Sequence, residues 1–107
     1  MKVTVYRDRY GEVSGFQVSG HSTYNTHGED ILCSAVSVLT INCMNSVEAL
    51  TDDEPLIQAV NEEEGFVHYR LKTISEGSRL LLRSWLLGME SIAETYGDYI
   101  QIEFEED

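Results

Sequence analysis

Hydrophobic and polar residues alternate along five short stretches of the chain and recur at helical spacing along two longer ones. Alternation with a period of two is typical of a β-strand that buries one face. The alternating stretches are residues 2–6, 12–21, 56–61, 66–72 and 99–107. Gly11 suits a hairpin turn between the first two strands, and the sequence EEEG at residues 62–65 suits a hairpin between the third and the fourth.

The first long apolar segment runs from Asp30 to about Leu50, and its apolar residues recur mostly at spacings of three and four. This periodicity predicts one helix that is buried on one side. The residues expected on that side are Ile31, Ala35, Val38, Leu39, Asn42, Val47 and Leu50. Because Pro55 cannot continue a helix, we expect the helix to end within the sequence TDDE that precedes it.

A second helix is predicted over residues 78–97, where apolar residues again recur at helical spacing. Its buried side is expected to comprise Leu82, Trp85, Leu86, Met89, Ile92, Ala93 and Tyr96. Gly97 stands where a left-handed C-terminal cap is expected, since glycine adopts a positive φ without strain.

Together these segments give the order β-β-α-β-β-α-β, which predicts an α+β fold with a largely antiparallel sheet and two helices packed on it. The chain has 107 residues, of which 42% are hydrophobic, and this is the size of one domain. No internal repeat and no linker-like stretch divides the sequence. We therefore expect a single domain over residues 1–107.

The sequence predicts neither export nor a membrane span. No stretch of the chain approaches the roughly 18 uncharged apolar residues that a span needs, since the richest one, RLLLRSWLLGM, is interrupted by Arg83. The first residues, MKVTVYRDRY, carry charges where a signal peptide needs an apolar region. We expect a cytoplasmic protein in which Cys33 and Cys43 are free thiols. One helix would hold these cysteines about 15 Å apart, too far for a disulfide.

The chain is strongly acidic, with 19 Asp and Glu against 7 Lys and Arg and a formal net charge of −12. Proteins that hold phosphate backbones do so with basic surfaces, so direct binding of nucleic acid is not expected. An acidic surface speeds the encounter with basic partners, of which a basic peptide or a ribosomal protein is the natural example. For most of these charges, however, the simpler interpretation is a solvated surface that keeps a small protein in solution.

Candidate chemistry is concentrated in GHSTYNTHGEDILCSAVS, residues 20–37, where His21 ends a predicted strand and Cys33 lies near a predicted helix start. With Asp30 as N-cap, Cys33 would be the third helical residue. Free N–H groups and the helix dipole favour an anion there, which lowers the pKa of a thiol and suits a reactive cysteine. Cys43 lies deep in the same helix and is interpreted as core packing.

On spacing alone, a structural thiol is the simpler interpretation, because a cysteine near a helix start with a histidine upstream is common. A non-catalytic acidic binding module would leave Cys33 inert, and a redox sensor would oxidise it reversibly. The sequence has no C-x-x-C pair near Cys33, and His21, Cys33 and one carboxylate lack the regular spacing of zinc ligands. Neither redox chemistry nor a metal is therefore favoured.

The segment as a whole resembles the ribosomal-processing cysteine proteases, a family of small bacterial proteins. The resemblance rests on Gly20 followed by His21, a short loop, Gly28 two positions before Asp30, and Cys33 followed by small residues and a serine. It extends through VNEEEGFVHYRL and the leucine-rich second helix, so it covers essentially the whole chain.

This resemblance implies a cysteine endopeptidase that removes a short N-terminal extension from a basic large-subunit ribosomal protein, the twenty-seventh by its conventional number. Cys33 would be the nucleophile and His21 the general base, without a metal or cofactor. His27 is a rival base, but the Gly-His pair of the family matches residues 20 and 21. The polar loop STYNTHGE, with Gly28 as a hinge, is expected to close over an extended substrate peptide.

Two further residues of the segment keep alternative roles. Asp30 either caps the helix or orients His21 as the third member of a triad. Ser37 lies one turn after Cys33 on the same face, where it lines the site or bonds the carbonyl four residues earlier. His68, outside the segment, is most simply a residue of a strand.

The resemblance also implies a homodimer, and the apolar arc of the second helix supports it. This arc is wider than packing on one face of a sheet requires. It comprises Leu80, Leu81, Leu82, Trp85, Leu86 and Leu87. The expected partners are thus a basic ribosomal protein as substrate and a second copy of the chain.

Overall fold

The computed structural model describes residues 1–20 and 27–107, with side chains described for residues 1–20 and 31–107. The elements follow the predicted order, which is confirmed. They are β1 (Lys2–Arg7), β2 (Val13–Ser19), α1 (His27–Leu50), β3 (Pro55–Asn61), β4 (Phe66–Leu71), α2 (Glu76–Tyr96) and β5 (Gln101–Glu106).

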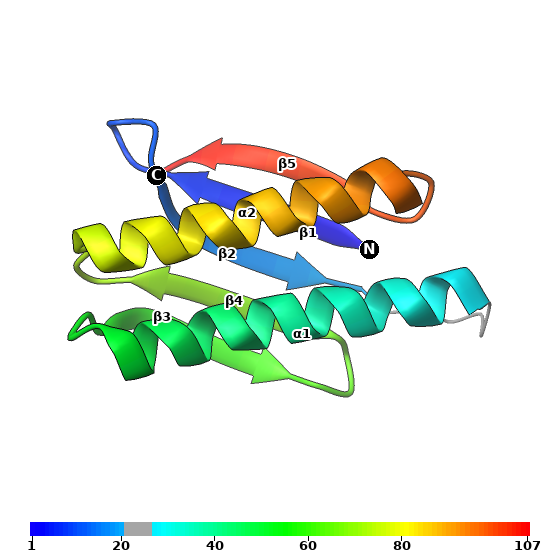
Figure 1. The fold of residues 1–107 in the computed structure, drawn as a ribbon, viewed down its shortest axis with the longest axis horizontal. Helices are drawn as coiled ribbons and strands as arrows, with labels where there is room; N and C mark the ends of the chain where they lie inside the picture. Colours follow the sequence, from blue (N-terminus) through cyan, green and yellow to red (C-terminus); the bar gives the residue numbers. More distant parts are fainter. Residues whose placement is uncertain (21–26) are drawn as a thin grey trace.

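The five strands form one mixed sheet in the order β3-β4-β2-β1-β5. All neighbours are antiparallel except β1 and β5, which run parallel because α2 carries the chain back across the sheet before β5 begins. Both helices lie side by side on one face of this sheet (Figure 1). The protein is therefore a two-layer α+β domain, as the element order predicts.

The core lies between the sheet and the helices. Val5 of β1, Phe16 of β2 and Tyr69 of β4 are neighbours across the strands and bury their side chains toward the helical layer. Trp85 of α2 stacks on Phe16, with 4.2 Å between ring centroids. Its indole N–H donates to the Thr40 hydroxyl of α1 at 3.1 Å, so one side chain joins the sheet and both helices.

The buried face of α1 differs from the predicted one. Buried there are Leu32, Val36, Thr40, Cys43, Met44 and Val47. Of the residues expected on the buried side, Val47 is buried, whereas Val38 and Leu50 are 68% and 73% exposed. Because α1 is apolar around most of its circumference, the spacing of apolar residues does not single out the side that meets the sheet.

This apolar character also contradicts the prediction that no stretch of the chain is long and apolar enough for a membrane span. By length and composition alone, Ile31–Leu50 within α1 is long and apolar enough to cross a membrane, with a mean hydropathy of 1.4. Its buried residues pack on the sheet, and the core helix of a globular domain meets the same criteria. Only about a third of this segment is buried inside the fold, so packing on the sheet accounts for part of its hydropathy.

The ends of α2 differ from prediction at both termini. The helix begins at Glu76, two residues early, because the Ser75 hydroxyl caps it by accepting a bond from the Ser78 N–H at 3.4 Å. Gly97 is not a left-handed cap, since its φ is −57° and it stays in the right-handed region. The chain instead leaves the helix through a tight turn in which the Tyr99 N–H donates to the Tyr96 carbonyl at 2.9 Å.

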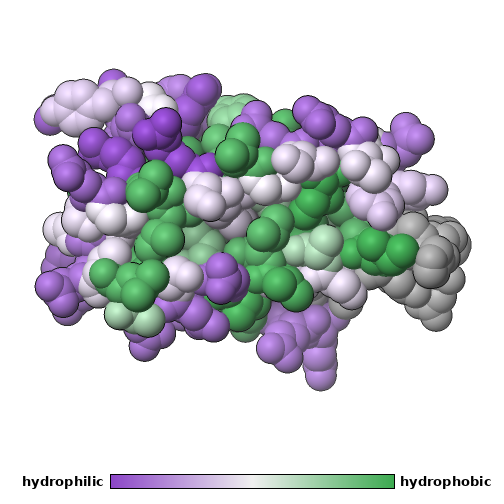
Figure 2. Space-filling view, viewed as in Figure 1, coloured by the Kyte–Doolittle hydropathy of each residue, from purple (hydrophilic) through white to green (hydrophobic). Residues whose placement is uncertain are grey.

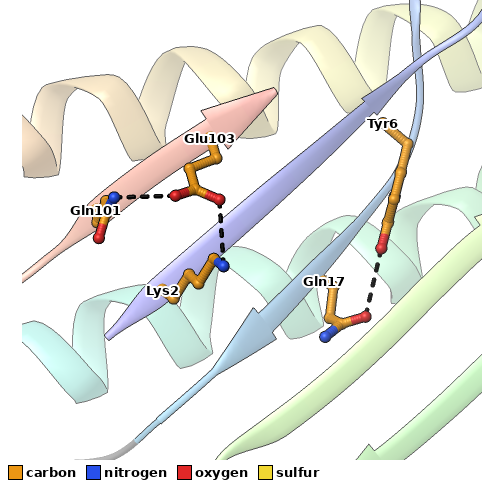
Figure 3. A network of polar contacts seen from close by, with 5 residues as sticks. All are labelled: Lys2, Tyr6, Gln17, Gln101 and Glu103. Atoms are coloured by element: carbon orange, nitrogen blue, oxygen red, sulfur yellow. Dashed lines mark hydrogen bonds and ion pairs between the residues drawn. The ribbon is translucent and has the colours of Figure 1, made fainter. Parts of the chain in front are cut away.

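The face of the sheet away from the helices is covered by polar side chains (Figure 3). Lys2 pairs with Glu103 at 3.2 Å, and the Tyr6 hydroxyl donates to the Gln17 side chain at 3.3 Å. The Arg70 guanidinium covers the Tyr6 ring at 3.6 Å and pairs with Asp107 at 2.7 Å. These contacts fix β1, β2, β4 and β5 against one another without a second helical layer.

Candidate active site

A cavity of about 300 Å³ lies between α1 and the hairpin of β3 and β4. One wall is formed by the α1 residues Cys33, Val36, Ser37, Thr40 and Ile41. The opposite wall is formed by hairpin residues, among them Val60, Phe66 and Val67. The end of β2 closes the cavity with Val18 and Gly20. The enclosure is largely apolar and has the size of a small-ligand or side-chain pocket.

Cys33 contributes a half-buried thiol to this cavity. Gly20 lines the same cavity, so the strand that ends in the Gly-His pair and the helix that carries the cysteine meet there. Gly20 has a φ of +96°, a backbone conformation that suits glycine and strains other residues. Ser37 also lies on the cavity wall, one turn beyond Cys33, so the structure brings Gly20, Cys33 and Ser37 together.

Cys43 has the opposite environment, as the sequence predicts. It is 4% exposed, and its thiol contacts the Leu81 carbonyl of α2 at 3.8 Å. Burial raises the pKa of this thiol to about 12, because the thiolate loses its hydration in the core. Cys43 is therefore a packing residue that remains protonated near neutral pH, and both cysteines are free thiols as predicted.

The start of α1 corrects the predicted setting of Cys33. The helix begins at His27, so Gly28 and Asp30 lie inside it, not at a loop hinge and an N-cap. Acidic residues are favoured throughout the first turn of a helix, and the acidic residue at position 30 therefore does not fix the helix start. Cys33 lies nearly two turns into α1, beyond the first four residues whose N–H groups lack helical partners.

Several predicted features fall outside the described residues or side chains. His21 and residues 22–26 of the polar loop lie outside the described residues. His27 and Asp30 belong to α1, but their side chains are not described, so neither the rival base nor the triad role of Asp30 is tested. His68 lies in β4 as predicted, near the Tyr6 and Phe66 rings on the outer face of the sheet.

The hairpin wall of the cavity was not predicted from the sequence. Val60 and Val67 are direct neighbours between β3 and β4, and both point toward α1. The alternation of both strands identifies an inward face. It does not reveal that α1 leaves a space above this face, because that depends on how the helix is seated.

The comparisons with known proteins agree with this geometry. Residues 1–101 match the family model described as cysteine protease Prp. The chain belongs to this family. It is accordingly a cysteine protease, a hydrolase that uses a thiol, and the resemblance noted in the sequence is confirmed at the level of the family.

Similar proteins span nearly the whole chain. The ribosomal processing cysteine protease Prp of Bacillus subtilis is 22% identical over 107 residues, covering 95% of each chain. A crystal structure of the essential ribosomal processing protease Prp from S. aureus, with a covalently linked product peptide, has a TM-score of 0.86 and 24% identity, covering 97% of this chain and 98% of that one. A second S. aureus structure, with a substrate peptide, has a TM-score of 0.84 and 21% identity at the same coverage.

We expect iodoacetamide at pH 7.5 to modify Cys33 at least about tenfold faster than Cys43 in the folded protein, because thiolate is the reacting species and Cys43 is both buried and protonated. Peptide mass spectrometry after brief labelling measures both sites. Cys43→Ala serves as the control and is expected to leave the fast labelling unchanged. Modification of Cys43 ahead of Cys33 would contradict the assignment of their environments.

Proposed function

We propose that this protein is an endopeptidase that removes the N-terminal extension of large-subunit ribosomal protein twenty-seven with a dyad of Cys33 and His21. The observation that carries the proposal is the position of Cys33, a half-buried thiol on the wall of an apolar cavity. The other cysteine, Cys43, is enclosed in the core and cannot reach a peptide. A cysteine protease of this sequence therefore has one suitable nucleophile.

His21 is proposed as the general base because of its place in the chain. It follows Gly20 directly, and Gly20 lines the same cavity as Cys33. One peptide bond thus ties the imidazole-bearing residue to the edge of the cavity. The Gly-His pair of the family matches these two residues and not His27, which favours His21 as the base.

The proposed reaction has two halves. His21 accepts the thiol proton, and the Cys33 sulfur forms a bond to the scissile carbonyl carbon. The tetrahedral intermediate collapses as the C–N bond breaks, and the imidazolium gives its proton to the leaving amine. Water then attacks the thioester, which releases the extension as a carboxylate and restores the thiol. No metal or cofactor takes part in this scheme.

The ribosomal substrate is proposed from the relatives, which are named ribosomal processing proteases. The cavity supports a substrate with an apolar or aromatic side chain near the cut. Val60, Phe66 and Ile41 line it, and its volume of about 300 Å³ accommodates such a side chain. The net charge of −12 favours the approach of a basic substrate, and two free thiols suit the cytoplasm in which we propose that the protein acts.

A matched set of variants tests the dyad. Cys33→Ala and His21→Ala are each expected to reduce cleavage of the extended ribosomal protein by at least about a thousandfold, since members of a catalytic unit act together. Cys43→Ala and His27→Ala are the controls and are expected to retain most of the activity. Mass spectrometry of the purified substrate after incubation measures the loss of the extension.

The alternative is an acidic binding module in ribosome assembly that does not cleave its partner. It predicts that Cys33→Ala leaves the function of the protein intact. A shortened product formed at an unchanged rate by Cys33→Ala would remove the proposed nucleophile. A His27→Ala variant as inactive as Cys33→Ala, together with an active His21→Ala variant, would transfer the role of base to His27.

We further propose that the protein forms a homodimer through its helical face. Figure 2 shows apolar residues gathered along this face, and Val38, Leu80 and Leu87 are exposed there by 68%, 66% and 68%. Large apolar side chains of this kind mark association surfaces, and a twofold dimer would bury the same residues of both copies.

Light scattering at micromolar concentration is expected to give twice the chain mass of 12.1 kDa. Leu87→Glu would place a charge in the proposed interface and is expected to give the monomer mass. Glu94→Gln on α2 is the control and should leave the dimer intact. A monomer mass for the unmodified protein would overturn the proposal.

A further inference from the structure

A second hollow, about 350 Å³ in volume, lies at the opposite end of α1 from Cys33, where the chain passes from α1 into β3. It is the acidic cleft, defined here by Glu48, Asp52, Asp53, Glu54, Gln58 and Tyr69. In Figure 1 it corresponds to the end of the molecule where α1 stops and β3 begins. Among the described residues that line it, none is basic.

The carboxylates of the acidic cleft are not neutralised within the fold. Glu48, Asp52 and Glu54 are exposed and form no ion pair with the part of the chain that the structure describes. Asp53 is committed to the start of α2, where it accepts bonds from the Ser75 N–H at 2.8 Å and the Ser75 hydroxyl at 2.6 Å. It therefore adds fixed negative charge to the cleft, while the other three carboxylates are available to a ligand.

Tyr69 supplies an independent observation that points to a ligand. Its side chain is 2% exposed and rises from β4 beside Phe16 to reach the wall of the cleft. No group in the described part of the chain hydrogen-bonds its hydroxyl. Burial is the main cause that raises the pKa of this phenol to about 12, and the nearby carboxylates of Glu48 and Asp53 act in the same direction, so the phenol stays neutral.

The ring of Tyr69 is buried, whereas its hydroxyl is not among the fully buried polar atoms that lack a partner, so this oxygen opens into the cleft. Polar groups at the edge of a protein interior are almost always hydrogen-bonded, and this hydroxyl is free to bond a ligand. The Tyr69 hydroxyl oxygen is an acceptor at the base of the cleft, and the carboxylates are acceptors around it. Such a ring of acceptors fits a ligand that presents several N–H donors and a positive charge. In the described residues no group of three or more His, Cys, Asp or Glu has the arrangement of a metal site. An organic cation therefore fits better than a metal ion.

We propose that the acidic cleft binds the guanidinium or ammonium group of an arginine or lysine side chain in a basic polypeptide. The side chain donates to the Tyr69 hydroxyl and to the Glu48 carboxylate, and its charge is balanced by Asp52 and Glu54. Charge complementarity selects the occupant, since the chain carries a net charge of −12 and the cleft concentrates four acidic residues. This site is separate from the cavity of Cys33 and does not depend on the proposed cleavage.

Titration calorimetry with a tetra-arginine amide peptide tests the proposal at low ionic strength, with Cys33→Ala as the background to prevent hydrolysis. Glu48→Gln is expected to weaken binding about threefold to fivefold, the range typical of an exposed ion pair. Glu94→Gln on α2 removes the same charge away from the cleft and is expected to change the dissociation constant less than about twofold. Equal losses in both variants would mean non-specific attraction and would overturn the site.

Tyr69→Phe isolates the contribution of the Tyr69 hydroxyl. It is expected to weaken peptide binding about threefold to tenfold, because it removes an acceptor from a charged donor. Its unfolding free energy should be unchanged or higher, since the hydroxyl has no partner in the fold. Tyr96→Phe is the matched control and should bind as the unmodified protein does.

Three results would overturn the assignment: no measurable binding, unchanged binding by both Glu48→Gln and Tyr69→Phe, or tighter binding of spermidine or Ca²⁺ than of the peptide. Because the readout is binding by a cleavage-deficient variant, it separates this site from the proposed protease function. Loss of peptide binding together with intact cleavage of the ribosomal protein would refute only the proposed binding site. Intact peptide binding together with loss of cleavage in the control variants Cys43→Ala and His27→Ala would count only against the dyad.

Discussion

The contact of Trp85 with Phe16 and Thr40 is the interaction on which the arrangement of the layers depends. The indole ring stacks on the Phe16 ring of β2 at 4.2 Å, and its N–H bonds the Thr40 hydroxyl of α1 at 3.1 Å. A buried indole N–H without an acceptor would cost about 1 to 3 kcal/mol, so the bond fixes both the spacing and the rotation of α1. Thr40 also lines the cavity that contains Cys33, so the same contact sets the position of the thiol.

This rotation divides the residues of α1 between two tasks. Val36, Thr40 and Val47 face the core and hold the helix on the sheet, together with Cys43. Cys33 and Ser37 face the hairpin of β3 and β4 instead, where Val60 and Val67 line a cavity. The chemical contrast between the two cysteines therefore follows from the seating of one helix: one thiol is sealed at 4% exposure and the other opens to a pocket.

The sequence predicts those parts of the structure that local patterns determine. Strand alternation predicts the five strands and their order along the chain, which is confirmed. The prediction of the buried side of α1 was wrong because apolar residues surround this helix. Only contact with the sheet selects Leu32 and Val36 over Val38. The predicted start of α1 was wrong because acidic residues are favoured throughout the first turn of a helix as well as at the N-cap.

The candidate site was predictable only in part, because local sequence patterns do not determine contacts between distant elements. The pattern of Gly20, Cys33 and Ser37 is local, and the structure gathers these residues around one cavity. Two features arise between elements far apart in the sequence: the cavity wall to which Val60 contributes, and the acidic cleft that Tyr69 lines. No spacing along the chain encodes them, since they depend on how the two layers meet.

The most direct test of the proposed active site is to label the protein with a peptide of the ribosomal extension that ends in a chloromethyl ketone at its apolar terminal residue. Peptide mass spectrometry then locates the adduct. The proposed function predicts one adduct, on Cys33, which is lost in Cys33→Ala and retained in Cys43→Ala. An adduct on Cys43, or an unchanged yield from Cys33→Ala, would contradict the claim that the thiol on the cavity wall performs the chemistry.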